Sequence, residues 1–208
     1  MTSSVPLRWG EQTPVGVGEA RERILDGAEA CLAREGYSKV TMEAVAAEAR
    51  ISRATLYRYF SNRDEVFSGV VVRETERYLD RIRFRVESQP DLGSAILEYV
   101  RVSLRAAQRD PVIAGLFAGD EGWLAGGVIA ESSVALFEMM IEFFRPMFAT
   151  HAAEVRPDTT VEDAGEWILR AVLSLVTVAG PKRRSEPALD AYLARFLLPA
   201  ILRAPEGR

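Results

Sequence analysis

The sequence has a single cysteine, a single histidine and no long apolar run. Cys31 has no partner for a disulfide within the chain, which is usual for proteins of a reducing cytosol. No apolar stretch reaches the length of about 18 residues that a membrane-spanning helix needs. Residues 1–18 also lack the apolar core of a secretory signal. These absences favour a cytoplasmic protein that does not enter a membrane.

Residue groups that carry catalysis are also scarce. His151 has no second histidine with which to complete a metal site or a catalytic relay. The chain has no glycine-rich phosphate loop and no convincing pair of carboxylates spaced on one helix face. The sequence therefore predicts no metal, no cofactor and no enzymatic activity.

Length and periodicity set the fold class. A chain of 208 residues that is 48% hydrophobic can bury a substantial core, and it has room for one small domain and one larger domain. Helical spacing of apolar residues recurs along the chain without a convincing strand. We expect an all-α fold of about nine helices, with a flexible arm over residues 1–18, a helix-turn-helix domain over 19–65 and a larger helical domain over 66–208.

Residues 41–60, TMEAVAAEARISRATLYRYF, have the pattern of two short helices separated by a tight turn. Apolar residues recur at helical spacing in both halves. Thr41 and Ser52 stand where N-caps belong, because a hydroxyl there can accept a hydrogen bond from a free amide of the first turn. The stretch is typical of a helix-turn-helix.

The second of these helices carries a local positive charge. The chain as a whole has a formal net charge of −4, so any affinity for nucleic acid must come from a local patch. Four arginines and no acid lie between Arg50 and Arg63, and Tyr57 and Tyr59 are interleaved with them. Guanidinium groups fit phosphate oxygens and guanine edges, and tyrosine offers a hydroxyl and a ring. This composition indicates a DNA-binding helix.

From about Arg21 to Phe67 the chain resembles the DNA-binding domain of the tetracycline-repressor (TetR) family. The matching landmarks are a first helix ending at Gly36-Tyr37, then TMEAVAAEA, ISRATLYRYF and SNRDEVF, and TLYRYF followed by Arg63 is the most specific part. The turn departs from the family pattern, because Arg50 stands where glycine is usual. We expect a left-handed backbone at Arg50, at a cost of about 1 kcal/mol, and an added phosphate contact.

The resemblance implies a DNA-binding surface on these residues. Arg53, Ala54 and Thr55 are expected to face bases, and Arg58 is expected to contact either bases or backbone. Contacts that position the DNA backbone are expected from Thr41, Arg50, Ser52, Tyr57, Tyr59 and Arg63.

The larger domain begins with a long helix. Asn62 and Glu65 have the spacing of a capping box, and an apolar stripe then continues to about Glu87. Further helices follow, and Pro111 is expected to open a short sixth helix. A helix between Leu124 and Phe148 is rich in Met and Phe, with Pro146 expected to kink or end it. Helix-spaced Met and Phe are most often core residues, but the family resemblance implies an apolar ligand cavity. Its expected lining is Phe117, Trp123, Phe137, Met140, Phe144 and Trp167.

The last two helices, over about 159–179 and 187–202, present more apolar surface than one layer of neighbours would cover. A partner chain is the natural cover, and the resemblance implies a four-helix dimer interface. The expected interface residues are Ile168, Val172, Leu175, Leu189, Tyr192 and Phe196.

The sequence thus predicts a dimeric, ligand-responsive transcriptional regulator, a repressor released from a palindromic operator in double-stranded DNA by a small apolar molecule. The alternative is a small-molecule-binding or protein-interaction module, or a structural DNA-bound factor, on the same scaffold without promoter control. The two differ in whether a ligand changes DNA affinity.

Overall fold

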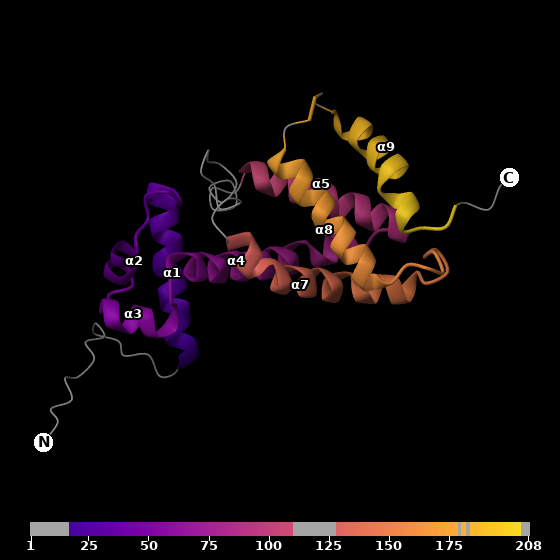
Figure 1. Ribbon diagram of the computed structural model, residues 1–208. Coiled ribbons are helices and arrows are strands. Elements are labelled where there is room, and N and C mark those ends of the chain that lie inside the picture. Colours follow the sequence, from indigo (N-terminus) through magenta and orange to yellow (C-terminus); the bar gives the residue numbers. More distant parts are fainter. Residues whose placement is uncertain (1–16, 110–127, 179, 182–183, 205–208) are drawn as a thin grey trace, which may run out of the picture. The chain divides into compact units, whose positions relative to one another are not determined.

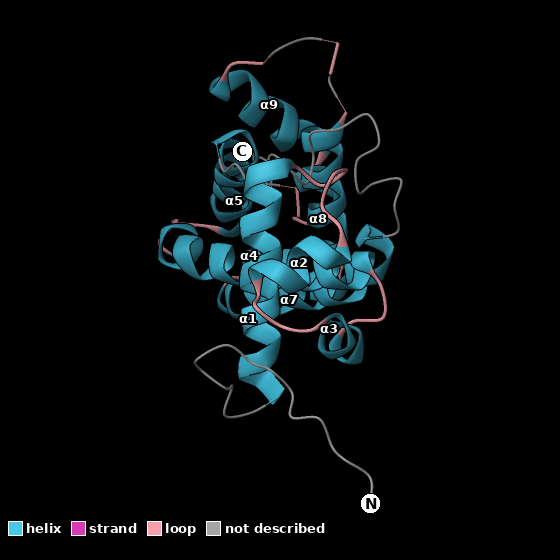
Figure 2. Ribbon diagram, turned by 90° about the vertical axis from the view of Figure 1, so that its left-hand side faces the viewer, coloured by secondary structure: helices cyan, strands magenta, loops and turns pink. Residues whose placement is uncertain are grey.

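The computed structural model describes residues 17–109, 128–178, 180–181 and 184–204. Throughout this part of the chain the structure consists of helices and loops, without a strand (Figure 2). The helices are α1 (Val17–Glu35), α2 (Met42–Glu48), α3 (Arg53–Tyr59), α4 (Arg63–Glu87), α5 (Leu92–Arg109), α7 (Val128–Thr150), α8 (Val161–Thr177) and α9 (Glu186–Phe196), followed by the 3-10 turn η1 (Leu198–Ala200) (Figure 1). The predicted all-α fold is confirmed. A sixth helix, expected from Pro111, lies outside the described residues.

The chain divides into two compact units. Among the described residues, the first unit comprises 17–74 and 128–133, and the second comprises 75–109 and 134–204 with its short gaps. Both α4 and α7 therefore contribute residues to both units. None of the helices in the described ranges is long and apolar enough to cross a membrane.

The core of the first unit forms where α1 packs against α2, and α2 against α3. Ile24 and Ala28 of α1, Val45 of α2 and Leu56 of α3 are completely buried. Gly27 permits the close approach of α1 to the end of α2, because a Cβ atom there would lie 3.0 Å from the backbone nitrogen of Ala49. The two short helices are thus held by a helix behind them, since helices of this length are marginal alone.

The turn between α2 and α3 has the left-handed residue that the sequence predicts. Arg50 has φ +55°, its amide donates to the carbonyl of Ala47 at 3.1 Å, and the amide of Ile51 donates to the carbonyl of Ala46 at 2.9 Å. These bonds form a Schellman motif, in which glycine is the usual left-handed residue. An arginine therefore occupies a strained position at the tip of the helix-turn-helix.

Helix α4 begins with a variant of the predicted capping box. Asn62 Oδ1 accepts from the amide of Glu65 at 2.8 Å, as expected, but Glu65 Oε2 accepts from the amide of Ser61 at 2.6 Å. The Glu65 carboxylate therefore pairs with the amide of Ser61, the residue before the cap, and not with the amide of the cap residue Asn62. Both bonds fix the start of α4 immediately after α3.

Arg73 joins α4 to α1 within the first unit. Its guanidinium donates to Glu22 Oε2 at 3.0 Å, to Asp26 Oδ1 at 2.8 Å and to Glu29 Oε2 at 2.7 Å, and only 8% of its side chain is exposed. Burial alone would lower the pKa of Arg73, but the three carboxylates outweigh burial and raise the pKa. Arg73 is therefore a charged clamp between the two helices.

In the second unit α5 packs against α8 and α9. A cluster of aromatic rings fills the core: the ring of Tyr99 lies 5.7 Å from that of Phe143 and 5.3 Å from that of Phe144, and its hydroxyl donates to Met140 Sδ at 3.0 Å. Burial raises the pKa of Tyr99. These close ring contacts are typical of a packed core.

Three helix ends in this unit differ slightly from the predicted ones. Helix α7 continues for one turn past Pro146, and Thr150 Oγ1 donates to the Pro146 carbonyl at 3.0 Å. Helix α8 begins at Val161, two residues later than expected, because Thr160 is its N-cap and accepts from the amide of Asp163 at 3.1 Å. The last predicted helix is shorter than expected, since α9 ends at Phe196 and Pro199 lies in η1.

Candidate nucleic-acid interface

Helix α3 is fixed at its start and leaves one face open. Ser52 Oγ accepts from the amide of Thr55 at 3.1 Å, so Ser52 is the predicted N-cap. Leu56 is completely buried and anchors the helix. On the other side, Arg53, Tyr57 and Arg58 are exposed, as is Ala54. This face carries two guanidinium groups, a phenol ring and no acid of its own.

The structure contradicts the predicted role of Thr55. Its side chain is only 3% exposed, and its Oγ1 lies 2.8 Å from Ser52 Oγ on the buried side of α3. Thr55 is two residues after Arg53, so it lies on the side of α3 that faces the core. Its hydroxyl contacts the N-cap residue Ser52. Thr55 therefore holds the start of α3 and does not face bases.

The cation at the end of α3 stacks on an aromatic ring. The Cζ atom of Arg58 lies 5.1 Å from the ring centroid of Tyr59, and Nη2 donates to the Tyr59 hydroxyl at 3.4 Å. Stacking restricts the guanidinium while its remaining N–H groups stay free to donate. Tyr57 is 47% exposed, so its ring and hydroxyl stand open to an approaching ligand.

Arg63 at the first turn of α4 is held by Tyr37, a residue that sequence reasoning did not place in the site. Arg63 Cζ lies 4.5 Å from the ring centroid of Tyr37, and Nη1 donates to the Tyr37 carbonyl at 3.5 Å. The Tyr37 hydroxyl donates to Asp64 Oδ1 at 2.8 Å. Burial and this hydrogen bond raise the pKa of Tyr37. The feature of the sequence that could have identified Tyr37 is its position directly after Gly36, at the end of the first helix.

Thr41 and Arg50 lie at the two ends of α2. Thr41 Oγ1 accepts from the amide of Ala44 at 3.2 Å, which confirms the predicted cap and leaves the hydroxyl proton free to donate. Arg50 is exposed at the strained turn. Both positions offer donors suited to phosphate oxygens.

Glu43 is the second residue that the sequence reasoning overlooked. Its Oε1 contacts Nη2 of Arg53, an ion pair between α2 and α3 in which the side chains are 51% and 64% exposed. Glu43 precedes the arginine-rich stretch, and neither helical periodicity nor composition signals a contact across the turn. One of the predicted base-facing arginines therefore carries an acid beside it.

The four described members of the predicted ligand lining do not lie at one place. Met140 and Phe144 lie in the aromatic core around Tyr99, whereas Phe137 is partly exposed under the guanidinium of Arg170, 5.5 Å from its ring centroid. Phe117 and Trp123 lie outside the described residues.

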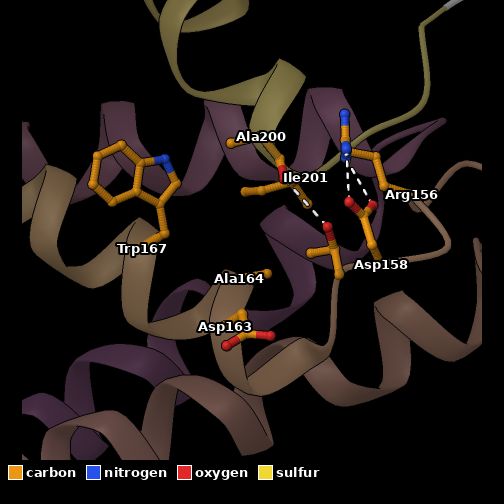
Figure 3. Close-up of a pocket in the computed structure, with 8 residues that line it drawn as sticks. Arg156, Asp158, Asp163, Ala164, Trp167, Ala200 and Ile201 are labelled. Carbon is orange, nitrogen blue, oxygen red and sulfur yellow. Dashed lines mark hydrogen bonds and ion pairs between the residues drawn. The ribbon is translucent and has the colours of Figure 1, made fainter.

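Trp167 stands apart, on the solvent side of α8, with 46% of its surface exposed. It lines an open pocket of about 510 Å³ between α8 and η1 (Figure 3). Across the pocket, Arg156 donates to Asp158 through Nε at 3.0 Å and Nη2 at 2.8 Å. Of the four described members of the predicted lining, Trp167 is the one that borders this pocket.

Two of the predicted interface residues are already covered by their own chain. Ile168 is completely buried and Val172 is 7% exposed, so the structure places both in the core and corrects their assignment to a free face. Helical periodicity identifies the apolar stripe of a helix, but it does not identify the neighbouring element that covers that stripe. Leu175 and Leu189 are partly exposed.

The aromatic residues of α9 do stand open. Tyr192 is 36% exposed and Phe196 58%, and their ring centroids lie 4.9 Å apart. The guanidinium of Arg184 lies 4.1 Å from the ring centroid of Tyr192. This face of α9 keeps the apolar surface that a partner chain would cover.

Comparison with known proteins agrees with the geometry. Residues 24–70 match the sequence model described as "Bacterial regulatory proteins, tetR family". An uncharacterized HTH-type transcriptional regulator of Mycobacterium tuberculosis is 29% identical over 184 residues, which are 88% of this chain and 85% of that protein. The HTH-type transcriptional repressor KstR of Rhodococcus jostii is 38% identical over 99 residues, 46% of this chain and 44% of that protein.

A solved structure has the same fold. The TetR family repressor AlkX from a Dietzia strain, implicated in biodegradation of n-alkanes, matches with a TM-score of 0.64 and 23% identity, over 92% of this chain and 97% of that one. These matches, together with the exposed α3 in a capped helix-turn-helix, identify a DNA-binding transcriptional regulator. Residues 24–70 are therefore a TetR-family DNA-binding domain.

Proposed function

We propose that the protein is a dimeric repressor that binds a palindromic operator and is released by a small apolar ligand. We assign DNA binding to residues 19–65 and ligand binding and dimerisation to residues 66–208; residues 1–16 of the arm expected from the sequence lie outside the described residues. Because a repressor acts on DNA, its place is the cytoplasm.

The observation that carries DNA reading is the open face of α3. Arg53, Tyr57 and Arg58 are exposed on a helix whose other side is buried and whose start is capped. Such a helix can enter the major groove with its N-terminal residues at base edges. Arg53 and Ala54 then face bases, Arg58 contacts bases or backbone, and backbone contacts come from Thr41, Arg50, Ser52, Tyr57, Tyr59 and Arg63.

Dimerisation is supported by the exposed aromatic and aliphatic side chains of α8 and α9. Tyr192 and Phe196 of α9 are exposed, and Leu175 and Leu189 are partly so. A two-fold related partner would cover this surface, and two copies of α3 would then address two half-sites of one operator.

An apolar ligand is supported by the family resemblance and by the composition of the second unit. Adaptable Met and Phe side chains pack around the buried hydroxyl of Tyr99, and they would move apart to admit the ligand. Ligand that binds one dimer state better than another shifts the population toward that state. If the favoured state holds the two α3 helices at a spacing that does not fit the operator, DNA affinity falls by the difference in ligand binding free energy.

Selection of bound duplexes from a random DNA pool tests the proposal. The purified protein should enrich a palindrome at moderate salt, because salt governs the electrostatic part of the affinity. Recovery of no consensus would contradict operator binding and would favour an interaction module. An enriched site also gives a genomic address, whose neighbouring genes narrow the choice of apolar compounds to add in a release assay.

A further inference from the structure

The two acids of α2 have different arginine partners. Glu48 accepts from Nη1 of Arg34 on α1 at 3.1 Å, and Arg34 also donates to Glu35 at 3.1 Å. Glu43 instead contacts Arg53, the first residue of α3. One acid thus belongs to the supporting helix, and the other lies beside the helix that reads DNA.

The Glu43 carboxylate changes which ligands Arg53 can accept. A phosphate that approaches the guanidinium also approaches the carboxylate, and the two anions repel each other. Guanine O6 and N7 are neutral acceptors, so the carboxylate penalises them far less. A guanidinium has five N–H donors, and a carboxylate that contacts Nη2 cannot occupy all of them, so others are left for a base.

Holding Arg53 also limits where it can reach. Both side chains are more than half exposed, so a free arginine at this place would sample many directions, including toward the DNA backbone. The ion pair to α2 restricts that sampling. The pair is surface-exposed and adds little to folding stability, so its removal should leave the fold intact.

We propose that Glu43 is a specificity-determining residue: it positions Arg53 to read a base and prevents Arg53 from acting as a general phosphate contact. Affinity for unrelated DNA is thereby lowered relative to affinity for the operator. This inference rests on the proposed function, in which α3 enters the major groove.

The test compares Glu43→Gln with wild type on two duplexes, the selected operator and a scrambled duplex of equal length, between roughly 50 and 200 mM salt. Loss of the carboxylate frees Arg53 for one more phosphate. For scrambled DNA the slope of log affinity against log salt should steepen by about 0.9, with a severalfold gain in affinity at the low end. The ratio of operator to scrambled affinity should fall.

Glu48→Gln is the matched control, since it removes one acid from the same helix while Arg34 keeps Glu35. It should leave the slope for scrambled DNA unchanged. Adding Arg53→Ala to Glu43→Gln should abolish the gain. Circular dichroism of each variant verifies that the helices are intact.

Several results would overturn the inference. These are an unchanged slope and affinity for scrambled DNA in Glu43→Gln, an equal gain in Glu48→Gln, or a gain that survives Arg53→Ala. A switched base preference without any change on scrambled DNA would mean that Glu43 itself contacts a base. Failure of the wild type to prefer any sequence would refute the proposed function separately, because the scrambled duplex still reports the effect of Glu43.

Discussion

Replacing Arg73 by methionine should weaken the first unit more than any exposed substitution on the same helix. Methionine keeps much of the length of the side chain and removes the guanidinium that joins α4 to Glu22, Asp26 and Glu29 of α1. The three carboxylates are then left as neighbours on one helix face, at spacings of three and four residues, where like charges repel.

The size of the effect follows from burial. Removing one partner of a fully buried ion pair costs about 3 to 5 kcal/mol. Arg73 is 8% exposed, but Glu22 and Asp26 are 55% and 64% exposed and Glu29 is 28% exposed, so the acids regain water in the variant. Removing the buried guanidinium also ends its own desolvation cost. We therefore expect a loss of about 2 kcal/mol in the free energy of unfolding.

Urea unfolding followed by circular dichroism measures this loss, with separate fits if the two units unfold in separate steps. Arg77→Met, one turn further along α4 at an exposed position, is the control and should change the free energy by less than about 1 kcal/mol, the most that an exposed side-chain interaction usually contributes. If Arg73→Met is as stable as the control, the carboxylate cluster does not clamp α1 to α4.

Other predictions concern the turn, the core and the α9 face. Arg50→Gly relieves the left-handed strain at φ +55° and should stabilise the protein by up to about 1 kcal/mol in thermal unfolding, yet weaken operator binding; equal or stronger binding would exclude a phosphate contact. Burial raises the pKa of Tyr78 from 10 to about 12. The stabilisation of the folded state by the neutral phenol is therefore complete below pH 10 and is lost as the pH rises through 12. Stability should therefore fall by about 2 to 3 kcal/mol over that range, and Tyr78→Phe should flatten the fall; an unaltered pH profile would contradict this role. Phe196→Glu should shift the sedimenting species from dimer to monomer, whereas Val134→Glu, at another exposed apolar residue, should not; a dimeric Phe196→Glu would exclude that face.

Local features of the fold were predictable from the sequence because they depend on residues close together in the chain. The hydroxyl caps at Thr41 and Ser52, the left-handed Arg50 and the long α4 are all set within a few residues. Capping chemistry and backbone sterics decide such features without knowledge of the neighbours.

Most of the errors and omissions come from contacts between elements. Thr55 is an exception, because its hydroxyl meets Ser52 at the cap of the same helix, and its burial turns it away from the exposed face. Ile168 and Val172 share the stripe expected at a dimer interface, and their own chain covers them. Periodicity identifies an apolar or polar face of a helix, but it does not identify the element that covers that face.

The residue types on the candidate DNA surface were predictable from the sequence, but the contacts between their side chains were not. The exposed Arg53, Tyr57 and Arg58 were expected from the arginine and tyrosine content of one short helix. The contacts of Glu43 with Arg53 and of Tyr37 with Arg63 join residues from different helices and turns. Such pairs depend on side-chain directions that follow only from the packed structure.

The most direct test of α3 as the DNA-reading helix is the operator affinity of Tyr57→Ala, measured beside wild type at the same salt with the oligomeric state followed by sedimentation. Tyr57 is 47% exposed, so its removal should leave the fold and the dimer intact. A loss of one DNA contact of about 1.4 kcal/mol corresponds to about tenfold weaker binding, which is the predicted result. Unchanged operator affinity, with the same oligomeric state, would contradict the account.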